Sequence, residues 1–89
     1  SEGPIIVKAE APWCNPCKFI APVVESACKK CGVPMYSLNV DEQPELAQSL
    51  DIIGLPTVVA FYDGEVFDGL GPSQASPQTI DELVERVAD

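Results

Sequence analysis

The chain has 89 residues, a length typical of one domain, so we expect a single domain over residues 1–89. Hydrophobic residues make up 46% and charged residues 21%, and these ordinary proportions exclude a disordered or low-complexity chain. Because 14 acidic residues face only 5 basic ones, the net charge is −9. This balance disfavours nucleic acid and anionic membranes as partners, since phosphate binding requires clustered Lys and Arg.

Membrane insertion and export are not predicted from the sequence. No apolar run approaches the roughly 20 residues that cross a bilayer. Residues 1–4 lack the basic segment and the apolar stretch of a signal peptide. We therefore expect a cytoplasmic protein that has no membrane partner and is a monomer.

The first half of the chain predicts a strand followed by a helix. Residues 5–10 are a β-prone run, and the apolar spacing becomes helical over residues 15–30. Pro22 predicts a kink in this helix, while Gly32 and Pro34 predict its end. The apolar positions expected on the buried side of the helix are Phe19, Ile20, Val23, Val24 and Ala27.

The second half of the chain adds further strands. Residues 35–40 alternate between apolar and polar types, which predicts a strand, and a short helix is expected to begin at Pro44. Residues 57–62 and 65–70 flank Asp63-Gly64, a dipeptide that favours a tight hairpin turn. The last two strands are therefore expected to be antiparallel.

The C-terminal segment predicts an amphipathic helix with one apolar side. Thr79 and Glu82 have the spacing of a capping box at its start. The complete order, β-α-β-α-β-β-α, predicts an α/β fold: a four-stranded mixed sheet with helices on both faces, its first two strands parallel. The apolar positions of this last helix are Ile80, Leu83, Val84 and Val87.

The four cysteines form two pairs of identical spacing, Cys14 with Cys17 and Cys28 with Cys31. Structural disulfides usually close long loops, so such tight pairs indicate redox chemistry or metal binding. The first pair lies where the first strand passes into the first helix, a placement that favours redox chemistry. There, free N–H groups and a partial positive charge stabilise the thiolate that attacks a disulfide.

The places of the two cysteines in the helix predict different roles. Cys14, at the mouth of the helix, is expected to be the exposed nucleophile. Cys17, in the first turn, is expected to be the shielded thiol that resolves the mixed disulfide. Lys18 adds positive charge nearby, and the chemistry requires neither a metal nor a bound cofactor.

The segment over residues 11–18, A-P-W-C-N-P-C-K, resembles the active-site signature W-C-G-P-C-K of the thioredoxin family, with Asn15 in place of glycine. Residues 54–57, G-L-P-T, resemble the cis-proline loop of that family, and residues 61–66 resemble its hairpin. The resemblance runs from about Gly3 to the C-terminus. It implies a thioredoxin-like fold that lacks the N-terminal strand and helix of full-length members.

The resemblance also implies a function. Such a protein reduces disulfides of target proteins and is regenerated by a thioredoxin reductase. In addition, the resemblance implies that Pro56 is cis and that the backbone of Leu55 pairs with an extended substrate segment. The residues implied for substrate binding are Trp13, Pro16, Leu55, Pro56 and Gly71. A core tryptophan at position 13 remains an alternative, as do Gly69 or an ordinary strand-end glycine in place of Gly71.

One part of the family pattern is missing. Family members bury an aspartate paired with a lysine beneath the resolving cysteine, and the equivalent positions here hold Lys8 and Ser37. Glu10 is expected to share a strand face with Lys8. We hypothesise that Glu10, paired with Lys8, or a trapped water accepts the proton of Cys17; alternatively, one or both of these side chains simply reach solvent.

The second cysteine pair and the rival functions stay open. Cys28 and Cys31 are either ordinary, part-buried thiols or a regulatory redox pair. A zinc ion shared by all four cysteines is excluded, because Cys14 and Cys28 are about 21 Å apart along one helix. The leading prediction is a protein-disulfide reductase, and the alternatives are a glutathione-coupled reductase, a C-x-x-C metal-binding module and a redox-inert scaffold.

Overall fold

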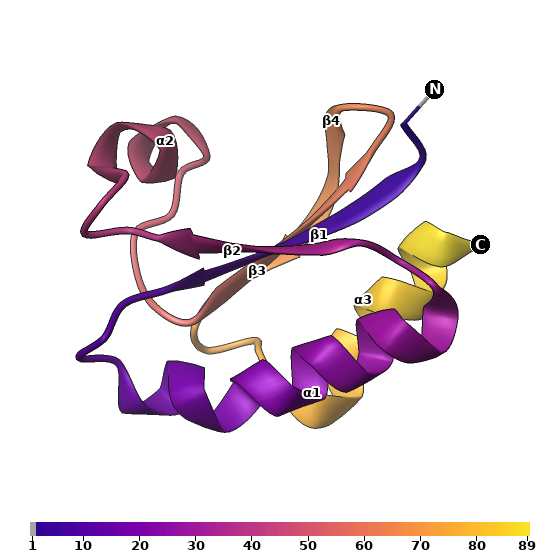
Figure 1. Ribbon diagram of the computed structural model, residues 1–89, viewed down its shortest axis with the longest axis horizontal. Coiled ribbons are helices and arrows are strands. Elements are labelled where there is room, and N and C mark those ends of the chain that lie inside the picture. Colours follow the sequence, from indigo (N-terminus) through magenta and orange to yellow (C-terminus); the bar gives the residue numbers. More distant parts are fainter. Residues whose placement is uncertain (1) are drawn as a thin grey trace.

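The computed structural model describes residues 2–89, and its elements follow the predicted order (Figure 1). The boundaries of the predicted strands and helices agree with it closely, although the second strand ends at Asn39 rather than at residue 40. The elements are β1 (Pro4–Glu10), α1 (Asn15–Cys31), β2 (Met35–Asn39), α2 (Pro44–Ser49), β3 (Thr57–Tyr62), β4 (Glu65–Leu70) and α3 (Pro77–Ala88).

The four strands form one mixed sheet in the order β2-β1-β3-β4. β1 and β2 are parallel, whereas β3 is antiparallel to both β1 and β4, as predicted. In the β1–β3 register Ala9 pairs with Thr57. Because of this pairing, the segment that follows β1 and the loop that precedes β3 meet at the same edge of the sheet.

The two faces of the sheet are covered unequally. α1 and α3 pack against each other and against one face, while the short helix α2 lies on the other side, beyond the end of β2 (Figure 1). Tyr36 and Val66 are 60% and 61% exposed. Helices therefore lie on both sides of the sheet, as predicted, but only one side holds a full core. That core contains Ile6, Ile20, Val24, Ala27, Cys28, Val33, Val58, Ala60, Leu70, Ile80, Leu83, Val84 and Val87.

Helix α1 packs on the sheet through one narrow stripe. The prediction that Phe19 belongs to this stripe is wrong, because its side chain is 72% exposed. Phe19 lies one position before the stripe and so faces away from the sheet. Gly32 ends the helix in the left-handed conformation with φ of 70°, and Pro22 remains within the helix. The buried residues of α1 are Cys17, Ile20, Val24, Ala27 and Cys28.

Helix α3 begins with a capping box, but not the one that was predicted. The Ser76 Oγ accepts the N–H of Thr79 at 3.2 Å, and the Thr79 Oγ1 accepts the N–H of Ser76 at 2.9 Å. The prediction of a Thr79–Glu82 box is wrong because the helix starts at Pro77, which makes Ser76 the N-cap and Thr79 the third helical residue. The predicted apolar side of this helix is buried.

The β3–β4 hairpin turns at Asp63 and Gly64, whose φ angles are 52° and 84°. Both values lie in the left-handed region, which the Asp-Gly dipeptide tolerates, so the predicted turn is confirmed. The turn also binds the segment just before β1, because the N–H of Gly3 donates to the Asp63 Oδ1 at 2.8 Å. Within the described part of the chain, no helix combines the length and the apolar character needed to cross a bilayer.

Candidate active site

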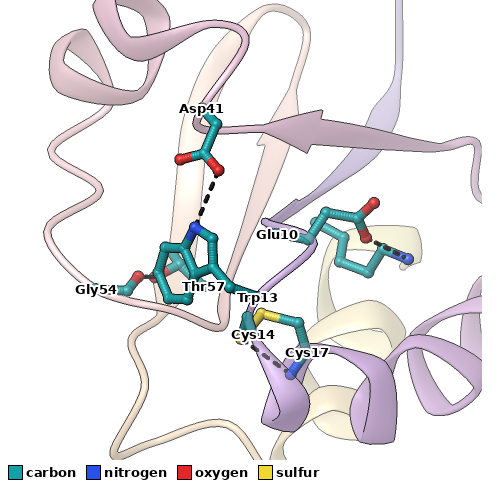
Figure 2. Close-up of a disulfide and its surroundings, with 8 residues drawn as sticks. Glu10, Trp13, Cys14, Cys17, Asp41, Gly54 and Thr57 are labelled. Carbon is teal, nitrogen blue, oxygen red and sulfur yellow. Dashed lines mark hydrogen bonds and ion pairs between the residues drawn. A yellow bond between two sulfur atoms is a disulfide. The ribbon is translucent and has the colours of Figure 1, made fainter.

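Cys14 and Cys17 are joined by a disulfide at the N-terminus of α1 (Figure 2). Their Cα atoms are 5.3 Å apart, within the usual range for such bridges. Cys14 is the N-cap residue of the helix, and its sulfur accepts the backbone N–H of Cys17 at 3.1 Å. The helix N-terminus thus directs a hydrogen-bond donor at the sulfur of Cys14, and after reduction the same donor would stabilise a thiolate there.

The predicted exposure is right for Cys17 and wrong for Cys14. Cys17 is shielded as expected, with 2% exposure, but Cys14 is only 3% exposed in the disulfide form. The prediction of an exposed Cys14 is therefore wrong for this state. The physical reason is the disulfide itself, which holds the Cys14 sulfur against Cys17 and the first helical turn.

Trp13 lies on the surface beside the disulfide. Its side chain is 67% exposed, so the alternative of a core tryptophan is wrong. The indole Nε1–H donates to the Asp41 Oδ2 at 2.9 Å, a contact drawn in Figure 2. Asp41 was not predicted as a site residue. Its signal was its place just after β2, because parallel strands β1 and β2 end at the same edge of the sheet.

The loop before β3 contains a cis peptide bond between Leu55 and Pro56, which confirms the implied cis-proline. The Thr57 Oγ1 donates to the carbonyl oxygen of Gly54 at 2.7 Å and closes this loop. Ile53 is 98% exposed, and sequence reasoning missed it because a loop isoleucine resembles a core residue. A shallow cavity of about 170 Å³ connects this loop with Trp13; its lining is Trp13, Val40, Ile52, Ile53, Gly54 and Leu55.

Gly71 lies near the same loop, and so does its competitor Gly69. Both glycines line one cavity of about 330 Å³ together with Ile53. A Cβ placed on Gly54 would come within 2.9 Å of the Pro72 side chain, so the segment after β4 abuts the cis-proline loop. Both glycines thus line the same cavity, so the structure does not decide which of them contributes to substrate binding. Pro16 is exposed in the first turn of α1, and its part in substrate binding stays a prediction.

Lys8 and Glu10, two residues apart on β1, form an ion pair. Figure 2 shows Glu10 across the disulfide from Trp13. The Lys8 Nζ lies 2.9 Å from the Glu10 Oε1, and the side chains are 5% and 34% exposed. The predicted pairing is confirmed. The alternative that these side chains reach solvent is wrong for Lys8 but holds in part for Glu10. Both residues line a cavity of about 330 Å³ whose wall also includes Cys17 and the exposed Lys18.

Cys28 and Cys31 are free thiols at the C-terminal end of α1. Cys28 is buried in the main core, and this burial, together with the nearby Cys31, raises the pKa of the Cys28 thiol to about 11. The predicted burial is confirmed, since Cys28 is buried and Cys31 is half-buried, whereas the choice between ordinary thiols and a regulatory redox pair stays a prediction. Across residues 2–89, no three or more His, Cys, Asp and Glu side chains gather in an arrangement that could hold a metal ion.

Comparison with known proteins assigns the family. The thioredoxin family model matches residues 1–88. The chain belongs to the thioredoxin family. It is 35% identical to thioredoxin of Bacillus subtilis over 85 residues, covering 90% of this chain and 82% of that protein. It is also 39% identical over 89 residues to the chloroplastic M-type thioredoxin of Pisum sativum, with 97% of this chain and 51% of that protein covered.

Solved structures agree with this assignment. A thioredoxin mutant from Halobacterium salinarum superposes with a TM-score of 0.90 at 27% identity, covering 99% of this chain and 77% of that one. Malassezia sympodialis thioredoxin gives a TM-score of 0.89 at 30% identity, covering 100% of this chain and 80% of that one. The chain spans about half or less of two of its chloroplast relatives, 37% of the spinach protein and 51% of the pea protein.

Proposed function

We propose that this protein is a protein-disulfide reductase that works by dithiol exchange. The observation that carries the proposal is the Cys14–Cys17 disulfide at the N-terminus of α1, where the N–H of Cys17 is directed at the Cys14 sulfur. A thiolate is the form that attacks a disulfide, and this position stabilises a thiolate. Membership of the thioredoxin family supports the same reaction.

The proposed reaction transfers two electrons from the dithiol to the target. The Cys14 thiolate attacks one sulfur of the target disulfide, forms a mixed disulfide and releases the first target thiolate. Cys17 loses its proton and attacks the Cys14 sulfur, which forms the Cys14–Cys17 disulfide and releases the second target thiolate. Both released thiolates take up protons. The two sulfur atoms carry the electrons, so no cofactor is part of the proposal.

The surface around the disulfide suits an extended segment of a target protein. Trp13 and Ile53 present exposed apolar side chains. Both line one cavity with Leu55, whose peptide bond to Pro56 is cis. We propose that the backbone of Leu55 pairs with the target segment, with Pro16, Pro56 and Gly71 shaping the groove. The partners are therefore disulfide-containing proteins, with a thioredoxin reductase as the electron donor and the protein acting as a monomer.

The cysteine usage supports a reducing compartment, and we propose the cytoplasm. Cys28 and Cys31 are free thiols, which persist where glutathione and thioredoxin keep thiols reduced. Some relatives are named as chloroplastic proteins, so localisation of the tagged full-length protein in its source cell is the direct test. An exclusively chloroplast signal would overturn the proposed compartment.

Reduction of insulin disulfides tests the proposed activity. We expect turnover when the protein is coupled to thioredoxin reductase and NADPH, and none for the Cys14→Ser variant. Turnover only with glutathione and glutathione reductase would favour a glutaredoxin-like enzyme instead. No turnover with either donor, for a folded protein, would favour a binding scaffold that is not a disulfide reductase.

A further inference from the structure

The Lys8–Glu10 ion pair is an unusual feature for the interior of so small a domain. Lys8 lies on β1, a central strand flanked by β2 and β3, and its side chain faces the helix side of the sheet with 5% exposure. Removing a charged group from water costs several kcal/mol, and a single ion pair often fails to recover that cost. The pair therefore needs an explanation other than stability.

The position of the pair relative to Cys17 offers that explanation. A cavity of about 330 Å³ has Lys8, Glu10 and Cys17 in its wall. Its volume exceeds that of several water molecules at about 30 Å³ each. The cavity is therefore large enough to hold water between Glu10 and Cys17, which is itself only 2% exposed.

Resolution of the mixed disulfide requires a proton acceptor. Cys17 must become a thiolate before it attacks, and bulk water has little direct access to its buried sulfur. The Glu10 side chain combines two properties that suit an acceptor: it borders the cavity and it is 34% exposed. The carboxyl group can thus take a proton from inside the protein and release it to solvent.

Few other charged side chains line the cavity. From β1 come Lys8 and Glu10, and from α1 come Cys17 and Lys18, while β2 contributes only the uncharged Asn39. The wall thus carries two cations and one carboxylate, and Glu10 is the only acidic side chain among its lining residues. Lys8 additionally holds the Glu10 carboxylate at 2.9 Å and so fixes it at the cavity wall.

We propose that Glu10 accepts the Cys17 proton across this cavity during resolution of the mixed disulfide, and that Lys8 is the positioning residue for Glu10. In this step the S–H bond of Cys17 breaks and its proton moves to Glu10. The new thiolate forms the S–S bond to Cys14, and the target thiolate leaves with the electron pair. Glu10 then passes its proton to solvent. This inference rests on the proposed dithiol exchange.

The aromatic disulfide DTNB separates the two thiol steps when all proteins carry Cys31→Ser, which removes the half-buried free thiol that would also react. Attack by Cys14 releases the first thionitrobenzoate at a rate that depends on DTNB concentration. Attack by Cys17 releases the second at a rate that does not. For Glu10→Gln we expect the first rate to stay within about twofold and the second to fall at least tenfold at pH 7, since positioned acid–base groups contribute about 10²–10⁴-fold. The deficit should shrink above pH 9, where a free thiol ionises unaided.

Matched variants separate this role from a purely structural one. Glu25→Gln removes an equal charge from the exposed side of α1 and should change neither rate. Glu10→Asp should recover part of the second rate. Because Glu10→Gln leaves Lys8 buried without its partner, the double variant Lys8→Met/Glu10→Gln provides a neutral cavity, and it should show the same slow second phase.

The outcomes distinguish this inference from the function on which it rests. A wild-type protein that releases only one thionitrobenzoate per Cys14–Cys17 pair would contradict the dithiol exchange itself. In the second outcome, the wild type releases both thionitrobenzoate molecules, and the Glu10→Gln and double variants release the second one as fast as the wild type across pH 6–9. That outcome would overturn only the role of Glu10.

Discussion

The two ends of helix α1 carry the same C-x-x-C spacing in opposite environments. At the N-terminus, Cys14 and Cys17 form a disulfide beside a backbone N–H donor and an exposed tryptophan. At the C-terminus, Cys28 and Cys31 are free, and Cys28 is enclosed in the core with a pKa raised to about 11. The positive end of the helix dipole favours a thiolate and the negative end disfavours it.

This contrast shows that the position of a C-x-x-C pair on its helix, rather than the spacing, decides its chemistry. Lys29 and Lys30 lie in the last turn of α1 and bring positive charge near the second pair. Both are exposed, however, and solvent screens their effect on a buried thiol. Burial therefore dominates at Cys28, and its thiol remains protonated at neutral pH.

The largest expected difference between the pairs is in activity. Cys14→Ser should lower insulin reduction by at least about 10³-fold, because removal of a covalent nucleophile leaves no alternative route. Cys31→Ser should remain within about twofold of the wild type. Parallel insulin assays with thioredoxin reductase measure both variants, and a comparable loss in Cys31→Ser would show that the second pair takes part in turnover.

The next effect concerns the charged pair beside the first two cysteines. Glu10→Gln leaves the buried Lys8 ammonium unpaired and should cost about 3 kcal/mol of unfolding free energy. Lys8→Met leaves a carboxylate that is 34% exposed, and since water can solvate it, the cost should be below about 1 kcal/mol. Urea unfolding of the reduced proteins measures both values, and equal costs would contradict the buried position of Lys8.

A smaller effect is expected from Cys28 at alkaline pH. Its native pKa of about 11 lies above the value of 9.0 for an unperturbed thiol, so the unfolded state releases this proton first. Stability from Cys28 is therefore complete below pH 9 and is lost as the pH rises towards 11. At pH 10 the loss should be about 1.4 kcal/mol, since each pH unit above 9.0 contributes about that amount until the pH reaches the native pKa.

Unfolding experiments at pH 8, 9 and 10 on the wild type and Cys28→Ala test this expectation. The variant should lose about 1 kcal/mol at pH 8, as other small core truncations do, and should lack the additional alkaline loss. A wild-type protein whose stability changes no more steeply than that of Cys28→Ala would show that the Cys28 thiol ionises normally in the fold.

Much of the fold followed from local signals in the sequence. The β-prone runs, the Asp63-Gly64 turn and the apolar side of α3 predicted the order and type of every element. The errors arose where tertiary packing decides. Apolar spacing alone did not reveal that Phe19 lies beside the buried stripe of α1. The capping residues of α3 depended on its first residue, which is Pro77.

The site divides in the same way. The Cys14–Cys17 pair was predicted from its spacing and its place at the start of a helix, and the cis-proline from the resemblance of residues 54–57 to the loop of the thioredoxin family. Asp41 and Ile53 were not predicted, since their contribution depends on loops that meet only when β1, β2 and β3 are assembled. The burial of Cys14 also escaped prediction, because it depends on how its sulfur packs against Cys17 and the first helical turn.

Site-resolved alkylation tests the contrast between the two pairs most directly. The fully reduced protein is pulsed with iodoacetamide at pH 7, and the modified cysteines are quantified by mass spectrometry. Cys14 should react at least about 100 times faster than Cys28, whose thiolate fraction at a pKa of about 11 is roughly one in ten thousand. Modification of Cys28 as fast as that of Cys14 would contradict the account, because the two ends of α1 would then be chemically equivalent.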